Sequence, residues 1–410
     1  MTIGLTKPEL VAPAGSREKL EYAIHYGADA VYLGLSRFGL RAGADNFEEE
    51  ELAAAINYAH QHRVKVYAAF NAFMRNSDVD AVRFSLSIFA ANAIDALIIS
   101  DPGMLYCIRR YAPDLPVHLS TQANTLNWAA VRFWEEQGIK RIILGRELNW
   151  REIKRIRAET PIELEVFVHG AMCMAYSGRC WLSQHLAGRD ANQGDCAHPC
   201  RWQYTLQEQK RPGMYFPVRE DSQGTQILSS KDLCLIDQIP LLAECAVNGL
   251  KIEGRTKSVH YVATMVNAYR QALEDYWRDP GGWTLDSDIR QETGKINHRP
   301  YTTGFFAAAE PNTDCHLAPT VTPATSEFAG LVLKYEEDTG MALVEQRGKF
   351  MVGDQMEILS PGKIPFAFRV RAIQDEKGTL LSAAPHPQQR IVIPVPQPVA
   401  ARDILRRMVN

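Results

Sequence analysis

The sequence predicts a TIM-type (β/α)8 barrel with a cysteine-rich insertion before its last strand, followed by a small C-terminal antiparallel β-barrel domain. Short apolar runs alternate with helical periodicity, as expected of parallel strands buried on both faces. One interval between strands is far longer than a crossover helix requires, and it contains a group of cysteines. After residue 326 the pattern changes to short alternating runs separated by turns.

Eight apolar runs are expected to form the barrel strands: Glu9–Ala14, Ala30–Gly34, Lys65–Asn71, Ala96–Asp101, Pro116–Gln122, Arg141–Leu148, Glu163–Gly170 and Leu250–Arg255. Helical spacing between them is clearest over Glu48–His60 and Asn127–Gln137. A doubly wound open sheet is the alternative. No GxGxxG motif follows the first strand, so the usual signature of that fold is missing.

The predicted domains are a barrel domain over 1–280, a linker region over 281–325 and a small β domain over 326–410. The cysteine-rich insertion covers 171–230 and should lie at the C-terminal mouth of the barrel. In the β domain, the runs GLVLKY, MALVEQ, QMEIL, FAFRVRAI and RIVIPV are separated by turn residues. The last segment, ARDILRRMVN, is expected to be a helix that closes this domain.

Composition narrows the class of protein. The formal net charge of −3 argues against a globally basic nucleic-acid coat, although it permits a local basic patch. No apolar run is long enough to span a bilayer, and the N-terminus shows no export signal, so we expect a cytoplasmic protein without a membrane partner. Of the 8 cysteines, five fall between Cys173 and Cys234, which in a reducing compartment favours metal ligation over disulfides.

The strongest chemical signal is the series Cys173-x6-Cys180-x15-Cys196-x3-Cys200, followed by Cys234. Buried structural thiols would explain it, but these cysteines stand among polar residues. Zinc prefers closely spaced pairs such as C-x2-C. Irregularly spaced thiolates on a loop suit an iron–sulfur cluster, which needs only four converging sulfurs. Arg179 and Arg201, next to two of these cysteines, would offset the negative charge of such a cluster.

Five cysteines compete for four ligand positions. Cys234 follows Ser229-x-x-Asp232, which resembles a capping box and would place Cys234 in the first turn of a helix. It would be a ligand if that helix end faced the loop. The alternative, which we favour, is that Cys196 and Cys200 both bind the cluster and Cys234 packs in the interior.

Polar residues at the ends of predicted strands are the second signal, and about half of them need no explanation beyond solvation. Charged groups inside barrel strands are costly unless paired or functional. Arg146 and Arg255 would clamp a carboxylated small molecule, with Glu147 and Glu253 as their partners. His169 is placed for proton transfer, and the alternative is a histidine that only forms structural hydrogen bonds. The full set is Asn71, Asp101, Gln122, Arg146, Glu147, His169, Glu253 and Arg255.

The segment from Glu165 to Ser183, EVFVHGAMCMAYSGRCWLS, resembles the signature of the collagenase-like peptidase family of unknown catalytic type. ELVAPAG, GADAVYLG, HLSTQANTLNW, ILGREL, NQGDCAHPCRW and LKIEGRTKS extend this resemblance over most of residues 8 to 310. Within the family, the chain is most similar to the branch that forms 5-hydroxyuridine in tRNA. That branch shares residues of the type seen at Asp190–Gly194 and a small C-terminal β domain.

The resemblance implies prephenate-dependent hydroxylation of a tRNA wobble uridine, with a 4Fe–4S cluster as cofactor, tRNA and a small dicarboxylate as partners, and an unidentified protein partner as a further option. It places the cluster ligands at Cys173, Cys180, Cys196 and Cys200, with Cys234 as the alternative because relatives acting on ubiquinone use that position. The chain is shorter between Tyr204 and Ser229 than in most of the tRNA-modifying branch. The resemblance also implies that the peptidase label of the family is historical.

These observations leave three candidate functions. The first is an RNA hydroxylase with His169, Glu147 and Glu253 as catalytic residues and with Arg146, Arg255, Gln122 and Asn71 as substrate-binding residues. The second is a peptidase, although HExxH, GxSxG and P-loop motifs are missing. The third is a non-catalytic iron–sulfur partner in a hydroxylation complex.

Overall fold

The computed structural model describes residues 6–35, 38–39, 46–173, 175–180, 182–201, 219–221, 224–226, 230–307 and 322–409. The chain divides into two compact units. The first comprises Met1–Ile24, Ala28–Lys257 and Arg299–Val321, and the second comprises His25–Gly27, Ser258–His298 and Thr322–Asn410. These units differ from the predicted boundaries at 280 and 326. The predicted linker also contains a helix, α10 (Ser287–Glu292), and its residues 308–321 lie outside the described part.

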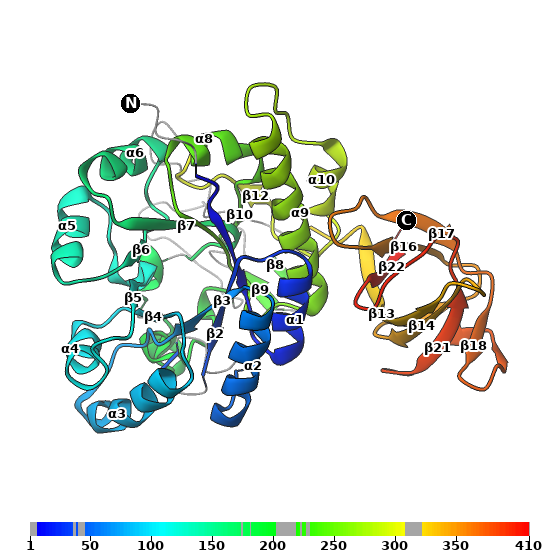
Figure 1. Ribbon diagram of the computed structural model, residues 1–410, viewed down its shortest axis with the longest axis horizontal. Coiled ribbons are helices and arrows are strands. Elements are labelled where there is room, and N and C mark those ends of the chain that lie inside the picture. Colours follow the sequence, from blue (N-terminus) through cyan, green and yellow to red (C-terminus); the bar gives the residue numbers. More distant parts are fainter. Residues whose placement is uncertain are drawn as a thin grey trace, which may run out of the picture. The chain divides into compact units, whose positions relative to one another are not determined.

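Parallel strands form a closed barrel in the first unit, which confirms the predicted fold class (Figure 1). Each strand pairs with the next along the chain, and β11 closes the ring by pairing with both β7 and β1. The strands are β1 (Glu9–Pro13), β2 (Ala30–Gly34), β3 (Lys65–Ala69), β4 (Ala96–Ile99), β5 (Val117–Leu119), β6 (Arg141–Ile143), β7 (Glu163–Ala171) and β11 (Gly249–Ile252).

Helices connect these strands, and Figure 1 shows α2 to α6 around the outside of the strand ring. Side-chain caps fix where several of them begin. Asp101 accepts hydrogen bonds from the N–H groups of Gly103 and Met104 at the start of α4, and Asn149 forms a capping box with Glu152 in α6. Their bounds are α1 (Arg17–His25), α2 (Glu49–Gln61), α3 (Asn76–Ala91), α4 (Pro102–Tyr111), α5 (Trp128–Glu136), α6 (Trp150–Glu159) and α8 (Ile239–Glu244).

The insertion between β7 and β11 consists mainly of short elements. In chain order they are the one-turn helix η2 (Tyr176–Gly178), α7 (Leu182–Ala187), η3 (Ala191–Gln193), η4 (Pro199–Arg201), β8 (Arg219–Asp221), β9 (Gly224–Gln226), β10 (Asp232–Cys234) and η5 (Ile236–Gln238). Parts of the predicted insertion, including 202–218 and 227–229, lie outside the described residues.

Cys234 is not in the first turn of a helix, so that prediction was wrong. It is the last residue of β10, which pairs antiparallel with β7 and parallel with β12 (Tyr301–Thr302). Asp232 does not act as a capping-box residue, because its carboxylate binds the guanidinium of Arg299 at 2.6 Å. A partner 67 residues away thus decides the local structure.

The second unit contains α9 (Val259–Arg278), α10 and the C-terminal antiparallel half-barrel. Its main sheet runs in the order β17-β16-β22-β13-β14-β21-β18-β19. The bounds are β13 (Ser326–Glu336), β14 (Met341–Gln346), β16 (Gln355–Leu359), β17 (Phe366–Arg369), β18 (Ile373–Asp375), β19 (Leu380–Leu381), β21 (Arg390–Pro394) and β22 (Ile404–Met408), with β15 (Phe350–Met351) and β20 (Ala383–Ala384) forming a separate pair.

The predicted C-terminal helix is wrong: the segment forms strand β22, which lies between β13 and β16. Leu405 is buried in the core of this domain. Arg406 is also buried, and its charge is compensated by Glu292 at 2.8 Å and Glu357 at 2.9 Å. These carboxylates come from α10 and β16. The buried charge of Arg406 is therefore compensated only when both elements pack beside β22.

Within the described ranges, no helix combines the length and the apolar character that a membrane span requires.

Candidate functional site

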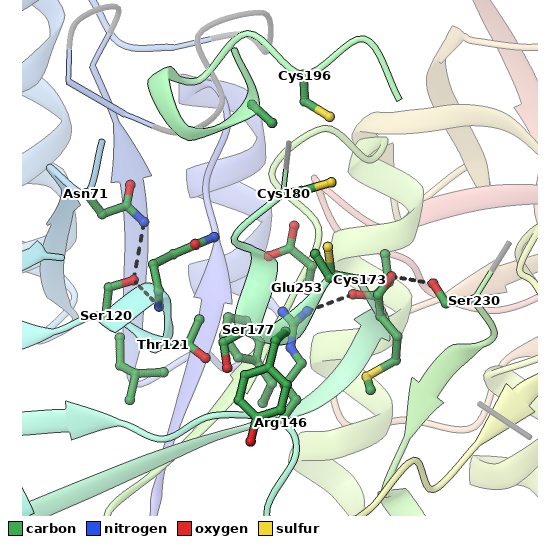
Figure 2. Close-up of a pocket in the computed structure, with 18 of the residues that line it drawn as sticks. Asn71, Ser120, Thr121, Arg146, Cys173, Ser177, Cys180, Cys196, Ser230 and Glu253 are labelled. Atoms are coloured by element: carbon green, nitrogen blue, oxygen red, sulfur yellow. Dashed lines mark hydrogen bonds between the residues drawn. The ribbon is translucent and has the colours of Figure 1, made fainter. Parts of the chain in front are cut away.

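A cavity of about 430 Å³ opens at the C-terminal ends of the barrel strands. Its wall combines residues that end or follow strands with residues of the cysteine insertion, as Figure 2 shows for Asn71, Arg146, Glu253 and Cys173. All of its lining residues belong to the first unit. The chain thus brings the two chemical signals of the sequence to one place, the end of the barrel where TIM-barrel enzymes carry their active sites.

Four cysteines line this cavity: Cys173, Cys180, Cys196 and Cys200. In Figure 2 the sulfur atoms of Cys196, Cys180 and Cys173 follow one another along the same side of the view. The Sγ of Cys180 accepts a hydrogen bond from the N–H of Leu182 at 3.4 Å, and the Sγ of Cys196 accepts one from the N–H of His198 at 3.4 Å. Such backbone donors stabilise thiolate charge and tune the clusters that thiolates hold.

The four thiols face a common space without forming a site for one metal ion. No three His, Cys, Asp or Glu side chains of the described residues are close enough to hold a single ion. A zinc ion needs sulfurs about 2.3 Å from one centre. A cluster attaches its cysteines to different irons, so its ligands surround a larger space. Four thiols are a donor set that either a zinc ion or an iron–sulfur cluster uses.

Four cationic side chains line the cavity: Arg146, Lys251, Arg255 and Arg299, of which Arg299 is paired with Asp232. Arg146 donates to the carbonyl of Ala171 at 3.0 Å, and its guanidinium lies 4.0 Å from the ring centroid of Phe167. Arg255 is 3% exposed, and its guanidinium occupies space beside Gly34 at the end of β2. Lys251 is 2% exposed, and its ammonium lies 4.4 Å from the ring centroid of Tyr32. Buried cations beside an open cavity are suited to bind an anion there.

Lys251 also belongs to a network of charges inside the barrel. Its ammonium donates to Glu165 at 2.8 Å, and Glu165 in turn binds Arg141 at 3.1 Å. Arg141 contacts Glu9 at 2.7 Å and Glu163 at 2.6 Å. Burial lowers the pKa of Lys251, and the neighbouring Glu165 carboxylate opposes this effect. Burial opposes ionisation of Glu165, but Lys251 and Arg141 outweigh it and hold the pKa of Glu165 below its usual value.

The two carboxylates predicted as catalytic residues both line the cavity, but Glu147 does not pair with Arg146 as expected. Glu147 accepts hydrogen bonds from the N–H of Ser177 at 2.5 Å and from its hydroxyl at 2.6 Å, and so holds the loop after Cys173. Within the described part of the chain, Arg146 forms no salt bridge. Glu253 accepts a hydrogen bond from the hydroxyl of Tyr32 at 3.2 Å.

The other predicted residues divide into two groups. Asn71 and Gln122 line the cavity, and Asn71 donates to the hydroxyl of Ser120 at 3.4 Å. His169 is 1% exposed and does not line it; its Nε2 lies 3.5 Å from the hydroxyl of Tyr301. Cys234 pairs with His169 across β10 and β7, also away from the cavity lining. Asp101 serves as the cap of α4.

Lys251 lines the cavity and was not predicted as a site residue. Residues two apart on a strand point to the same side. Lys251, Glu253 and Arg255 alternate in the KIEGR segment and all three line the cavity, although β11 ends at Ile252. Tyr32, Ser120 and Arg299 also line the cavity without having been predicted, because their partners are distant in the sequence.

Comparisons with known proteins agree with this architecture. The profile of peptidase family U32 matches residues 15–315, and the profile of the peptidase family U32 C-terminal domain matches residues 324–406. The first match covers the barrel, the insertion and the cavity residues, and the second covers the antiparallel half-barrel.

Several named relatives are similar to this chain over nearly their whole length. The tRNA hydroxylation protein P1 of Bacillus subtilis (strain 168) is 39% identical over 401 residues, which cover 98% of this chain and 95% of the relative. The tRNA hydroxylation protein P of Escherichia coli (strain K12) is 37% identical, covering 95% of this chain and 94% of the relative. A protein named collagenase from Porphyromonas gingivalis is 31% identical, covering 97% of each.

Proposed function

The chain belongs to peptidase family U32, and from this membership and its cavity we propose that it is an enzyme that hydroxylates tRNA. The observation that carries the proposal is its similarity, over almost the full length of both chains, to two proteins named for tRNA hydroxylation. The finer form of the proposal is the conversion of a wobble uridine to 5-hydroxyuridine, with prephenate as the small co-substrate.

The charges of the cavity support a small anionic co-substrate. Prephenate carries two carboxylates, and a neutral pocket could not hold a dianion without strong compensation. Arg146, Arg255 and Lys251 line one cavity at the ends of β6 and β11. A planar guanidinium binds a carboxylate through two parallel hydrogen bonds, and an ammonium adds a point charge. We therefore assign the recognition of the carboxylates to these three side chains.

We further propose that Cys173, Cys180, Cys196 and Cys200 hold a 4Fe–4S cluster. The four thiols line the same cavity as the cations, and two of the sulfurs already accept backbone hydrogen bonds. Such a cluster would supply one-electron redox chemistry at the mouth of the barrel. Glu147 would keep the loop between the first two ligands in place, since it binds Ser177 through two hydrogen bonds.

Mass spectrometry of tRNA nucleosides tests the function. A strain that lacks this chain should lose 5-hydroxyuridine and its derivatives at the wobble position, and a plasmid copy should restore them. Unchanged 5-hydroxyuridine in a strain without any second member of the family would overturn the proposal.

A second candidate function is thiol-dependent peptide hydrolysis, because Cys196 and His198 both line the cavity. The Sγ of Cys196 lies 3.9 Å from Nδ1 of His198, and a thiol beside an imidazole is the basis of cysteine peptidase chemistry. Hydrolysis of gelatin by the purified protein, with loss of hydrolysis in His198→Ala, would establish it. In that case 5-hydroxyuridine levels in the His198→Ala strain would remain normal.

A further inference from the structure

Between the first two cavity cysteines lies the one-turn helix η2, whose first residue, Tyr176, lines the cavity. Tyr176 is 58% exposed, yet it lines the cavity. Single exposed aromatic side chains are common on protein surfaces and need no explanation by themselves. Tyr176 differs because its backbone is held from several directions while its ring remains accessible.

Three neighbours hold the backbone at Tyr176. Its carbonyl accepts hydrogen bonds from Nδ2 of Asn124 at 3.3 Å and from the N–H of Arg179 at 3.1 Å. The next residue, Ser177, is buried and bound to Glu147 through both its N–H and its hydroxyl. The ring is therefore carried on a backbone that is fixed before any ligand arrives, so little ordering entropy opposes binding.

Arg179 is the C-cap residue that ends η2, and it lies outside the cavity lining. Its guanidinium lies 5.0 Å from the ring centroid of Phe73, and its Nε donates to the carbonyl of Gln122 at 3.0 Å. Its side chain is exposed and forms no salt bridge with a carboxylate of the described residues. An accessible ring on a held backbone and an exposed cation three residues later match the two parts of a nucleotide, its base and its phosphate.

We propose that Tyr176 stacks on the target base of the RNA substrate and that Arg179 binds a phosphate beside it. This inference rests on the proposed RNA hydroxylation and names the residues that would hold an unstacked pyrimidine over the cavity. An enzyme that modifies a base must receive that base outside the stack, and unpaired loop nucleotides are the ones most easily presented in this way.

The test is the binding of a synthetic anticodon stem–loop RNA to the full-length, anaerobically purified protein. One RNA carries uridine at the wobble position, and a second carries an abasic site there. Tyr176→Ala should weaken binding of the uridine RNA by about five- to a hundredfold, the range expected for loss of one base–aromatic stack. The same variant should bind the abasic RNA as the wild type does, and Tyr176→Phe should bind both RNAs normally.

Arg179→Gln should behave differently, because a phosphate contact does not depend on the base. It should weaken both RNAs alike and reduce the salt dependence of binding by about one unit in the log–log slope. Tyr106→Ala and Arg83→Gln are matched controls: Tyr106 is 66% exposed on α4, Arg83 lies over the ring of Tyr111, and neither lines the cavity.

Two results would overturn the inference. One is equal affinity of the wild type for the two RNAs, and the other is an equal loss for both RNAs in Tyr176→Ala, which indicates a structural role. Either result leaves the proposed function intact if the deletion strain lacks 5-hydroxyuridine. Conversely, normal 5-hydroxyuridine in that strain removes the proposed function whatever the binding data show.

Discussion

Lys251 on β11 donates to Glu165 on the neighbouring strand β7 across 2.8 Å, and both side chains are almost completely buried. Lys251 reaches the cavity, whereas Glu165 continues through Arg141 to Glu9 at the start of β1. The cation at the cavity is thus held by a chain of compensating charges inside the barrel. This relationship gives the interior a role in positioning the site as well as in stability.

The first prediction concerns Glu165→Gln. The variant leaves Lys251 and Arg141 buried without their shared counter-charge, so the free energy of unfolding should fall by about 3–5 kcal/mol. Chemical denaturation followed by circular dichroism measures it. Glu159→Gln is the control, because Glu159 pairs with Arg155, whose side chain is 66% exposed, and its loss should change stability by less than about 1 kcal/mol. Equal effects of the two substitutions would contradict the network.

The second prediction concerns the arginines at the cavity. Arg146→Ala and Arg255→Ala should abolish wobble-uridine hydroxylation while iron remains bound. Loss of a buried charge-assisted contact costs about 2–5 kcal/mol, or about thirtyfold or more in affinity. Lysine should restore little activity, because a point charge cannot reproduce the fork of a guanidinium. Wild-type 5-hydroxyuridine in both alanine variants would remove these side chains from the mechanism.

The third prediction uses Gly34, at the end of β2. A Cβ at this position would lie 1.8 Å from Nη1 of Arg255, so Gly34→Ala must displace the guanidinium. Arg255 is buried and has little room to move. Gly34→Ala should therefore reproduce the activity loss of Arg255→Ala. Gly281→Ala, whose Cβ would meet no atom closer than 3.9 Å, should retain normal 5-hydroxyuridine.

The fourth prediction separates the candidate cluster ligands. Anaerobically purified wild-type protein should be brown and contain about four irons per chain, as a 4Fe–4S centre requires. Cys200→Ser should lose most of this iron, because Cys200 lines the cavity, whereas Cys234→Ser should keep it. Iron loss in Cys234→Ser would make Cys234 the fourth ligand. Colourless protein with one zinc ion would refute the cluster.

The fifth prediction concerns pH. His260 in α9 is buried against Phe328, and burial, aided by Arg406, lowers its pKa to about 3. In the unfolded chain its pKa returns to about 6.5, so the unfolded state binds one more proton between these values. Stability is therefore lost as the pH falls below about 6.5. Between pH 7 and pH 5 this residue alone should remove about 2 kcal/mol.

His260→Gln tests this assignment, since the variant cannot bind that proton. Urea unfolding of both proteins at pH 7 and pH 5 should show a smaller loss of stability on acidification in the variant. His62→Gln is the control, because His62 is exposed. An identical pH dependence in wild type and His260→Gln would exclude His260 as the source.

The two wrong predictions of local structure have a common cause. ARDILRRMVN was expected to be a helix that closes the domain, but the carboxylates that compensate Arg406 lie on α10 and β16 and are not visible in the local sequence. At Asp232 the local pattern resembled a capping box, but the carboxylate pairs with Arg299 instead. In both cases a local pattern permits two structures, and a charge partner far along the chain selects one.

The sequence by itself determined the eight barrel strands and the place of the cysteine-rich insertion, because these depend on local periodicity and on chain order. The sequence also shows that Lys251, Glu253 and Arg255 stand at alternating positions. Only the tertiary structure decided which polar strand-end residues face the cavity. In the folded barrel, Arg146 and Arg255 line the cavity and Asp101 caps a helix. His169 and Cys234 lie outside the cavity lining. The physical reason is that burial and ion pairing depend on distances between strands, and these arise only when the barrel closes.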